Sequence, residues 1–386
     1  MLERIVIDHF KSFKERTEIS FVKTNYNILP GNVAENGILK GTLFVGPNAS
    51  GKSNIICAIK FLLDSLFANT NINSEIYPCL FSEKKYFSID YYFYINQEHI
   101  SYHIDVDPIK PFITETLLVS DELLFERIGQ SARTFQSGET DAVYDESYID
   151  KETLFLRTLY FNTKFAANKT LRLWMEYLAS SVYLNAHERR TVCYGKNVQE
   201  LIPIRYLQNN GDKRINEFFE KYNFDQEIEY AHEVSSNTIT LKVGSGDEEK
   251  DIFFKRKGLG TPIPFNQESL GNQNLIFVLP SFFKVLEQGG LLLIDEFSSG
   301  FHNDLEELLV KYFMEKSNNS QLIFVSHSTN LLSNSLLRPD QEYAVEFNGA
   351  NGSTVKRFSS EQPRMAQNVE KMYLSGVFGG LPNYGG

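Results

Sequence analysis

LFVGPNASGKSN, residues 43–54, decides the fold of this chain. Residues 46–53 match G-x-x-x-x-G-K-[ST] without a mismatch, the pattern of a loop whose backbone N–H groups surround nucleotide phosphates. An apolar strand is expected over residues 41–45, and apolar residues at helical spacing follow from Lys52. Because this motif needs a strand before it and a helix after it, the sequence predicts nucleotide binding here. The residues expected at the nucleotide are Gly46, Pro47, Asn48, Ala49, Ser50, Gly51, Lys52, Ser53 and Asn54.

A second motif, LLLIDE at residues 291–296, supplies the expected acidic groups. Its apolar run predicts a buried strand that ends in Asp295 and Glu296. We expect Ser53 and Asp295 to hold Mg²⁺, and Glu296 to orient or polarise the attacking water. An acidic pair at a strand end is otherwise only a solvent-facing edge, but the phosphate loop in the same chain favours the catalytic interpretation.

The distance in sequence between these motifs narrows the class of nucleotide-binding protein. Lys52 and Asp295 lie too far apart for a small GTPase, and Asn168-Lys169-Thr170-Leu171 lacks the aspartate of the base-reading motif. This spacing predicts a P-loop ATPase with an insertion.

A helix is expected just before the acidic strand, over residues 268–290, because apolar residues recur there on one face. Pro280 is expected to kink or split this helix. Ser269 and Gly271 fall at its N-terminus, where free N–H groups and the helix dipole favour an anion. A simpler interpretation, in which Ser269 only caps the helix, stays open.

Three parts are expected along the chain. Residues 1–135 form an N-terminal lobe with strands over 2–22 and a hairpin over 86–107. Residues 136–225 form a mainly helical insertion after a polar boundary at 136–147, with helices over 154–166 and 168–187. Residues 226–386 form a C-terminal lobe, in which strands and helices alternate before a hairpin near 347–354 and a short helix.

The composition indicates an acidic globular protein. Hydrophobic residues make up 42% of the 386 residues, enough for a sizeable core. Lys plus Arg number 38 against 49 Asp plus Glu, a net charge of -11, so a nucleic-acid contact would have to be a local patch. Three cysteines without a C-x-x-C pair argue against a zinc site or a disulfide framework. The charged opening and the lack of a long apolar run predict a cytoplasmic protein without membrane contact.

The order of four motifs resembles an ABC-type ATPase head of the OLD, RecF and SMC kind. The motifs are GPNASGKS, SLGNQ, LLLIDEFSSGFH and LIFVSHS. Within that group the chain is most similar to stand-alone "ATP/GTP phosphatase" heads of phage-defence operons, such as those of RloA, AbiL and PARIS-type systems. IDHFKSF at the start, LLFER at 123–127 and YLSGVFGGLPN at 373–383 add to the resemblance, and residues 136–225 match poorly. The resemblance implies an α/β fold with a mixed β-sheet core, an antiparallel β-subdomain and a helical insertion.

The resemblance also implies roles for individual residues. Ser269 and Gly271 would be the signature, which reaches the γ-phosphate of ATP held by the opposite subunit. Ser299 and Gly300 would form the D-loop at the dimer seam. His327 would be the switch histidine, catalytic together with Lys52 and Glu296.

The pattern departs from the family at two points. The signature has one glycine fewer than the common Ser-Gly-Gly, and no convincing Q-loop glutamine follows the phosphate loop. Gln97 lies at a predicted turn tip, where a solvated turn residue is the simpler interpretation.

These observations predict a slow ATPase that uses ATP and Mg²⁺, closes as a homodimer or higher homo-oligomer around ATP, and regulates an operon-encoded effector, a toxin or nuclease, in anti-phage defence. Nuclease activity of the chain itself is not expected, because Asp105-Val106-Asp107 lies in a predicted strand. A DNA-binding ATPase of the RecF kind in repair or restriction stays open. Its basic candidates are His187–Arg190 with Lys196, and Lys255–Lys257. A transporter's ATPase subunit is a third possibility, which the RecF-like opening disfavours.

Overall fold

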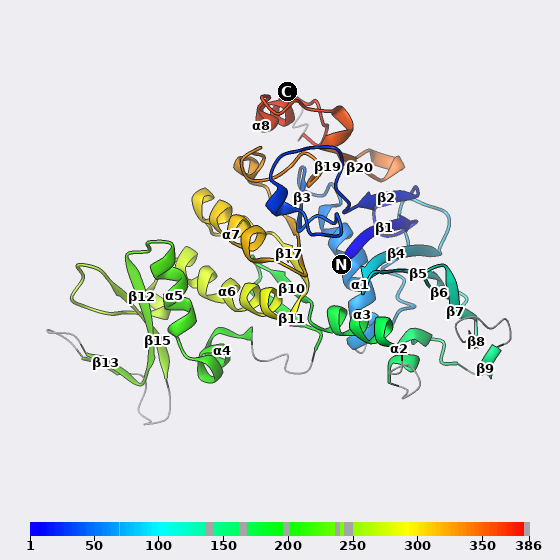
Figure 1. The fold of residues 1–386 in the computed structure, drawn as a ribbon, viewed down its shortest axis with the longest axis horizontal. Coiled ribbons are helices and arrows are strands. Elements are labelled where there is room, and N and C mark those ends of the chain that lie inside the picture. Colours follow the sequence, from blue (N-terminus) through cyan, green and yellow to red (C-terminus); the bar gives the residue numbers. More distant parts are fainter. Residues whose placement is uncertain are drawn as a thin grey trace.

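Two β-sheets with helices between and beside them form the body of the molecule (Figure 1). The structure, a computed structural model, describes residues 1–68, 70–135, 142–147, 149–161, 168–195, 201–235, 240–242 and 250–381.

The central sheet has seven strands. In spatial order they are β11 (Arg190–Cys193), β10 (Val182–Asn185), β17 (Gly290–Asp295), β18 (Ser320–Val325), β3 (Gly41–Val45), β19 (Glu342–Phe347) and β20 (Ser353–Arg357). The five inner strands run parallel, and the two outer strands are antiparallel to their neighbours. Every residue of β3, β17 and β18 is buried, as expected of parallel strands covered on both faces.

The second sheet has eight strands and is antiparallel throughout. Its order is β2 (Thr17–Ser20), β1 (Leu2–Asp8), β4 (Phe87–Ile95), β5 (Glu98–Asp107), β6 (Phe112–Val119), β7 (Glu122–Ile128), β8 (Ser131–Phe135) and β9 (Ala142–Ser147). Buried and partly exposed side chains alternate along β5, the pattern of a sheet with one face on the core.

Helices α1 (Lys52–Phe67) and α3 (Lys169–Ala179) lie between the two sheets. The hydroxyl of Tyr91 in β4 donates to the carbonyl of Ala58 in α1 at 2.6 Å. Trp174 of α3 is fully buried and packs edge-on against Phe93 and Tyr102. The bond of Tyr91 joins the antiparallel sheet to the helix that follows the phosphate loop, and the contacts of Trp174 join the same sheet to α3.

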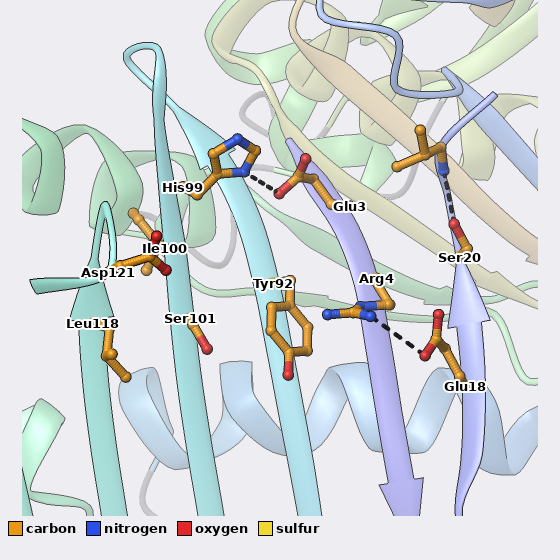
Figure 2. Close-up of a pocket in the computed structure, with 11 residues that line it drawn as sticks. Glu3, Arg4, Glu18, Ser20, Tyr92, His99, Ile100, Ser101, Leu118 and Asp121 are labelled. Carbon is orange, nitrogen blue, oxygen red and sulfur yellow. Dashed lines mark hydrogen bonds and ion pairs between the residues drawn. The ribbon is translucent and has the colours of Figure 1, made fainter.

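The outer face of the antiparallel sheet carries polar side chains around a hollow of about 500 Å³ (Figure 2). The guanidinium of Arg4 lies 3.9 Å from the ring centroid of Tyr92 and donates to Glu18 at 3.4 Å. The Nδ1 atom of His99 lies 2.9 Å from a carboxylate oxygen of Glu3. The charges on this face are thus largely paired with one another.

The other face of the central sheet is covered by α6 (Leu270–Gln288) and α7 (Asn303–Lys316). Beside α6 lies a smaller unit (Figure 1), which holds α4 (Pro203–Asn210), α5 (Lys213–Lys221), a sheet of β12 (Gln226–Ala231), β15 (Asp251–Arg256) and β16 (Ile263–Pro264), and a pair of β13 (Glu233–Ser235) with β14 (Thr240–Lys242). The remaining helices are α2 (Phe155–Tyr160) and α8 (Val369–Leu374), with 3₁₀ turns at Pro30–Asn32, Phe265–Gln267, Thr329–Leu331, Gly349–Asn351 and Phe358–Glu361.

Most predicted elements are confirmed. The predicted strands over 2–22, the hairpin over 86–107 and the hairpin near 347–354 are β1–β2, β4–β5 and β19–β20. The mixed sheet core and the antiparallel β-subdomain of the predicted fold class are both present. The positive φ angles of Asn96 and Gln97 place Gln97 at the tip of a tight hairpin turn.

The helix predicted over 168–187 is wrong beyond Ala179. Residues 182–185 form β10, which pairs in parallel with β17 inside the central sheet. The hydroxyl of Ser181 donates to the carbonyl of Tyr177 and accepts from the N–H of Leu291. It therefore satisfies the end of α3 and the start of β17 together, and the chain turns from helix into sheet.

The proposed division at residues 136 and 225 stays a prediction, but the segment between these residues contributes β10 and β11 to the central sheet. Conversely, the first strands of the predicted C-terminal lobe, β12 to β16, form small sheets of their own, and the lobe joins the central sheet only from β17 onward. The predicted helix over 154–166 is α2 up to Tyr160. Residues 162–167 lie outside the described part of the chain, as do Lys196 and residues 136–141 of the predicted boundary.

Pro280 does not split the predicted helix. It lies inside α6, which runs without interruption from Leu270 to Gln288, 19 residues in all. A proline in a helix interior normally costs about 3 kcal/mol, because it lacks the N–H for one backbone hydrogen bond and its ring clashes with the carbonyl one turn earlier. Burial offsets this cost, since Leu279, Pro280 and Ser281 are all buried.

Candidate nucleotide-binding site

The phosphate loop connects β3 to α1 and has a backbone that favours glycine at two positions. Gly46 and Gly51 have φ values of 153° and 106°. A Cβ at Gly46 would lie 2.2 Å from the carbonyl oxygen of Val345, and one at Gly51 would lie 2.4 Å from Oγ of Ser353. The loop therefore packs tightly against β19 and β20, with its N–H groups at the N-terminus of α1, where the helix dipole favours an anion.

Lys52 folds back over this loop. Its Nζ donates to the carbonyl oxygens of Gly46 and Pro47 at 2.8 and 2.7 Å. Burial lowers the pKa of Lys52 to about 8, and the carboxylates of Glu296 and Asp295 oppose this shift. The ammonium thus lies above the loop that would hold the phosphates.

Ser53 and Asp295 meet at the carboxyl end of β17. The Oγ of Ser53 donates to Oδ1 of Asp295 at 2.9 Å. Burial raises the pKa of Asp295, while the hydrogen bond from Ser53 partly opposes this shift. A hydroxyl beside a carboxylate fits the oxygen ligands that Mg²⁺ takes beside nucleotide phosphates, so these two residues fit the predicted metal site.

Glu296 and His327 lie together beyond the ends of β17 and β18. The Nε2 atom of His327 is 3.6 Å from Oε2 of Glu296. Glu296 has a φ of 55°, a left-handed conformation that costs a non-glycine residue free energy and is most common at functional sites. Burial, followed by the nearby Lys52 ammonium, lowers the pKa of His327.

A single pocket of about 800 Å³ brings the first four residues of the phosphate loop together with Asp295, Glu296 and His327. The other predicted nucleotide-binding residues, Ser50 to Asn54, are not among the described residues that line it. Its size is sufficient for a small-molecule ligand. The residues that line it are Gly46, Pro47, Asn48, Ala49, Asn185, His187, Glu188, Asp295, Glu296, His327, Thr329, Tyr373, Leu374 and Leu381. Sequence reasoning missed Asn185, because the strand that places it was predicted as a helix, and it named His187 and Glu188 only as part of the basic run proposed for DNA. Tyr373 and Leu381 belong to the matched closing stretch, but no role was assigned to them.

The signature and D-loop residues form a second group. Ser269 caps α6, where its Oγ accepts from the N–H of Asn272 at 3.4 Å. A Cβ at Gly271 would lie 3.1 Å from the carbonyl oxygen of Gly300, so the start of α6 packs on the D-loop. Among the described residues that line the pocket, none is Ser269, Gly271, Ser299 or Gly300.

The basic runs proposed for DNA are largely engaged in contacts within the chain. Arg256 pairs with Glu268 at 2.5 Å, and Lys255 pairs with Glu229. Arg189 donates to two side-chain amides of α6. These pairings leave less free positive charge than the sequence indicates.

The described residues were expected to lack a zinc site, disulfides and membrane-spanning helices, and the structure gives the following for each. They contain no group of three or more His, Cys, Asp or Glu side chains placed to hold a metal ion, so a metal here would depend on phosphate oxygens as further ligands. None of the three cysteines, Cys57, Cys79 and Cys193, forms a disulfide. In the part of the chain that the structure describes, no helix has the length and apolar character needed to cross a bilayer.

We expect the affinity for ATP to fall as the pH rises above 8. In the nucleotide-free protein the pKa of Lys52 is about 8, so the ammonium loses its proton above this pH. Bound phosphates would favour the ammonium and raise this pKa. The complex then holds more protons than the free protein above pH 8, and affinity declines by up to about tenfold per pH unit.

Titration of a fluorescent ATP analogue at pH values from about 7 to 9.5 measures this decline. Lys52→Arg is the control, because its guanidinium stays charged and its profile should be flat. A flat profile in the unmodified protein would contradict the prediction.

The parallel order of β17, β18 and β3, the loop before α1 and the acidic pair at the end of β17 define the fold of this protein as that of a P-loop nucleotide-binding domain. The profile of the AAA_21 family, described as "AAA domain, putative AbiEii toxin, Type IV TA system", matches residues 42–333. The chain belongs to this family.

Solved structures with a related arrangement share little sequence with the chain. The SMC head domain from Thermotoga maritima is 16% identical at a TM-score of 0.46, over 92% of this chain and 97% of that chain. The Smc head domain with an extended coiled coil bound to the C-terminal domain of ScpA, derived from Pyrococcus furiosus, is 16% identical at a TM-score of 0.45, over 92% and 95%. Among curated proteins none matches the chain. The family assignment therefore rests on residues 42–333.

Proposed function

We propose that this chain is an ATP-driven switch. Two copies close face to face around two molecules of ATP with Mg²⁺, and hydrolysis opens them again. The observation that carries the proposal is the separation of two groups in one chain. The start of the phosphate loop lines one pocket with Asp295, Glu296 and His327, whereas Ser269 and Gly271 lie outside that lining, at the start of α6, where Ser269 caps the helix and Gly271 packs on Gly300. A second chain would supply the signature.

Each residue of the candidate site has a distinct role in this proposal. The N–H groups of residues 46–53 and the ammonium of Lys52 bind the phosphates. Mg²⁺ held by Ser53 and Asp295 would neutralise charge that develops on the phosphate oxygens. Glu296 accepts a hydrogen bond from the attacking water and polarises it. His327 reaches the γ-phosphate, and its contact with Glu296 orients both side chains.

We further propose that the switch controls a separate effector, a toxin or nuclease, in anti-phage defence. The family's description names a toxin and a toxin–antitoxin system, which supports an effector partner. A regulatory ATPase tolerates slow turnover, because its output depends on whether the dimer is open or closed.

The alternative, a DNA-binding ATPase, has less support. The net charge is -11, and Arg256, Lys255 and Arg189 have partners within the chain. Retention on DNA at low salt with a steep loss as salt rises would favour it. Co-purification with the product of a neighbouring gene would favour the effector.

A mixing experiment tests the shared site. Ser269→Asp keeps a good helix cap but places a carboxylate against the partner's γ-phosphate, so we expect it to be inactive alone, as is Lys52→Ala. A one-to-one mixture should regain about a quarter of the parent ATPase rate, because half of the dimers are mixed and each mixed dimer has one intact site.

Ser269→Asn, which caps equally well without the charge, serves as the control and should retain most activity. Full activity of Ser269→Asp alone would exclude a role for this residue in the site. A mixture that stays inactive would contradict the exchange of parts between chains.

A further inference from the structure

We infer that Arg189 is a positioning residue, which ties the turn beside a chain's own nucleotide pocket to the signature helix and D-loop that the same chain presents to its partner. The inference rests on the proposed function and deepens it, since it names the connection between the two ATP sites of the dimer.

The turn between β10 and β11 borders the pocket. Asn185, the last residue of β10, is the parallel-sheet neighbour of Asp295, and the N–H of Ala186 donates to the carbonyl of Asp295 at 3.1 Å. The Oδ1 atom of Asn185 accepts from the N–H of Glu188 at 2.8 Å. Asn185, His187 and Glu188 all line the pocket. This turn is therefore held directly against the backbone of Asp295, whose carboxylate is expected to bind Mg²⁺.

Arg189 extends from this turn to α6. Its Nε donates to Oδ1 of Asn274 at 2.6 Å, and its Nη1 donates to Oε1 of Gln273 at 3.0 Å. Two directed bonds from one planar guanidinium fix orientation as well as distance. The residue adopts a φ of 49°, a strained conformation outside glycine, and its Nη2 is buried without a partner among the described residues. Both features cost free energy, and proteins tolerate such costs mainly at functional sites.

Asn274 passes the connection on to the D-loop. It is 3% exposed, and its Nδ2 donates to the carbonyl of Ser299 at 3.0 Å. A Cβ at Gly300 would lie 2.5 Å from the same Nδ2 atom, so the D-loop has no room to shift toward α6. His187 adds a direct link, because its Nδ1 lies 3.2 Å from Oγ of Ser299.

Gln273 passes the connection on to the signature. Its Nε2 donates to the carbonyls of Phe265 and Glu268, each at 2.9 Å. Glu268 directly precedes Ser269, and its carboxylate accepts from the N–H of Ser269 at 2.6 Å. A displacement of the turn beside Asp295 thus moves the signature and the D-loop together, through the bonds of Arg189 and, for the D-loop, also through the contact of His187 with Ser299. We call this set of bonds, from Arg189 through Asn274 and Gln273, the Arg189 strut. It supplies coupling between the pocket and the dimer surface, for which the sequence offered no Q-loop glutamine.

The test uses full-length protein in a Glu296→Gln background, in which ATP-bound dimers are expected to accumulate. Adding Arg189→Ala should leave the affinity of the single chain for a fluorescent ATP analogue within about twofold, but weaken ATP-dependent dimerisation by at least about tenfold, since two hydrogen bonds to a charged group are lost. Arg189→Lys should recover only part, because a point charge cannot make both directed bonds. Arg205→Ala, at an exposed arginine of α4, is the matched control and should dimerise normally.

The outcomes separate this inference from the proposed function. If the Glu296→Gln protein itself does not dimerise with ATP, the proposed function fails. If it dimerises and Arg189→Ala does so equally well, the strut is wrong. If Arg189→Ala melts at a clearly lower temperature than the control, Gln273→Ala carries the test instead. This variant, at a half-buried position, removes the acceptor of the Arg189 Nη1 together with the bonds to the carbonyls of Phe265 and Glu268. It breaks the branch that runs to the signature and should weaken dimerisation severalfold, and unchanged dimerisation would again overturn the strut.

An experiment that mixes two variants shows whether Arg189 acts on the ATP site of the partner chain or on the pocket of its own chain. Arg189→Ala mixed with Lys52→Ala should regain ATPase activity in the same way as Ser269→Asp, because the intact P-loop then meets an intact signature. If Ser269→Asp regains activity in the mixture and Arg189→Ala does not, Arg189 acts on its own pocket and the inference falls.

Discussion

The variant Glu296→Gln should bind ATP, hydrolyse it at least about 100-fold more slowly than the parent, and accumulate as an ATP-bound dimer. The amide has the shape of the carboxylate but cannot accept a proton from the attacking water. Glu296 lies at the end of β17, one residue beyond Asp295, and 3.6 Å from His327. Its loss should therefore spare phosphate binding and remove the step that opens the dimer.

Phosphate release under saturating ATP measures the rate, and sedimentation or light scattering with and without ATP measures the dimer. Glu315→Gln, on the exposed side of α7, makes the same chemical change away from the pocket and should behave as the parent does. Hydrolysis by Glu296→Gln at the parent's rate would show that another group activates the water.

The variant Lys52→Ala should lose at least about tenfold in affinity for ATP, because a charge-assisted hydrogen bond to phosphate contributes about 1.5–3 kcal/mol. Any protective activity in cells should disappear with it. The Nζ atom already lies over the loop, bound to the carbonyls of Gly46 and Pro47, so no other described side chain is as well placed to replace it.

Calorimetric or fluorescence titration measures the affinity, and challenge with phage measures protection. Lys311→Ala, at an exposed lysine of α7, is the control and should retain both. If Lys52→Ala loses protection but binds ATP normally, the phosphate role of Lys52 is wrong. If it loses ATP and keeps protection, the switch is not driven by nucleotide.

Local patterns were sufficient to predict the core of the site. The phosphate loop is a short contiguous motif, and its neighbours in space follow from a rule of parallel sheets, whose strand ends meet at one edge. Asp295 and His327 each follow an apolar run, so their approach to the loop was foreseeable. The pocket confirms that these residues lie together, while their roles stay predictions.

What the sequence did not show depends on packing between distant segments. Val182–Leu184 is a short apolar run directly after a helix, without an intervening glycine or proline, and periodicity cannot separate a buried strand from more helix over so few residues. The error concealed Asn185, and Arg189 was named only as part of a basic run proposed for DNA. The contact of Arg189 with Asn274 joins residues 85 positions apart, and no local signal marks such a pair.

The position of β3 within the central sheet has a consequence for synthesis of the protein. β3 pairs with β18 on one side and β19 on the other, so residues 41–45 find their partners only when residues 322–325 and 342–344 have been made. At roughly 5–20 residues per second, the ribosome needs roughly 15–60 s to reach them. Until then the nascent chain carries an apolar strand that has no paired strands, and a phosphate loop that lacks its packing partners in β19 and β20. Chaperones would have to shield this segment, and a nucleotide-responsive pocket cannot form before residue 344 has been made.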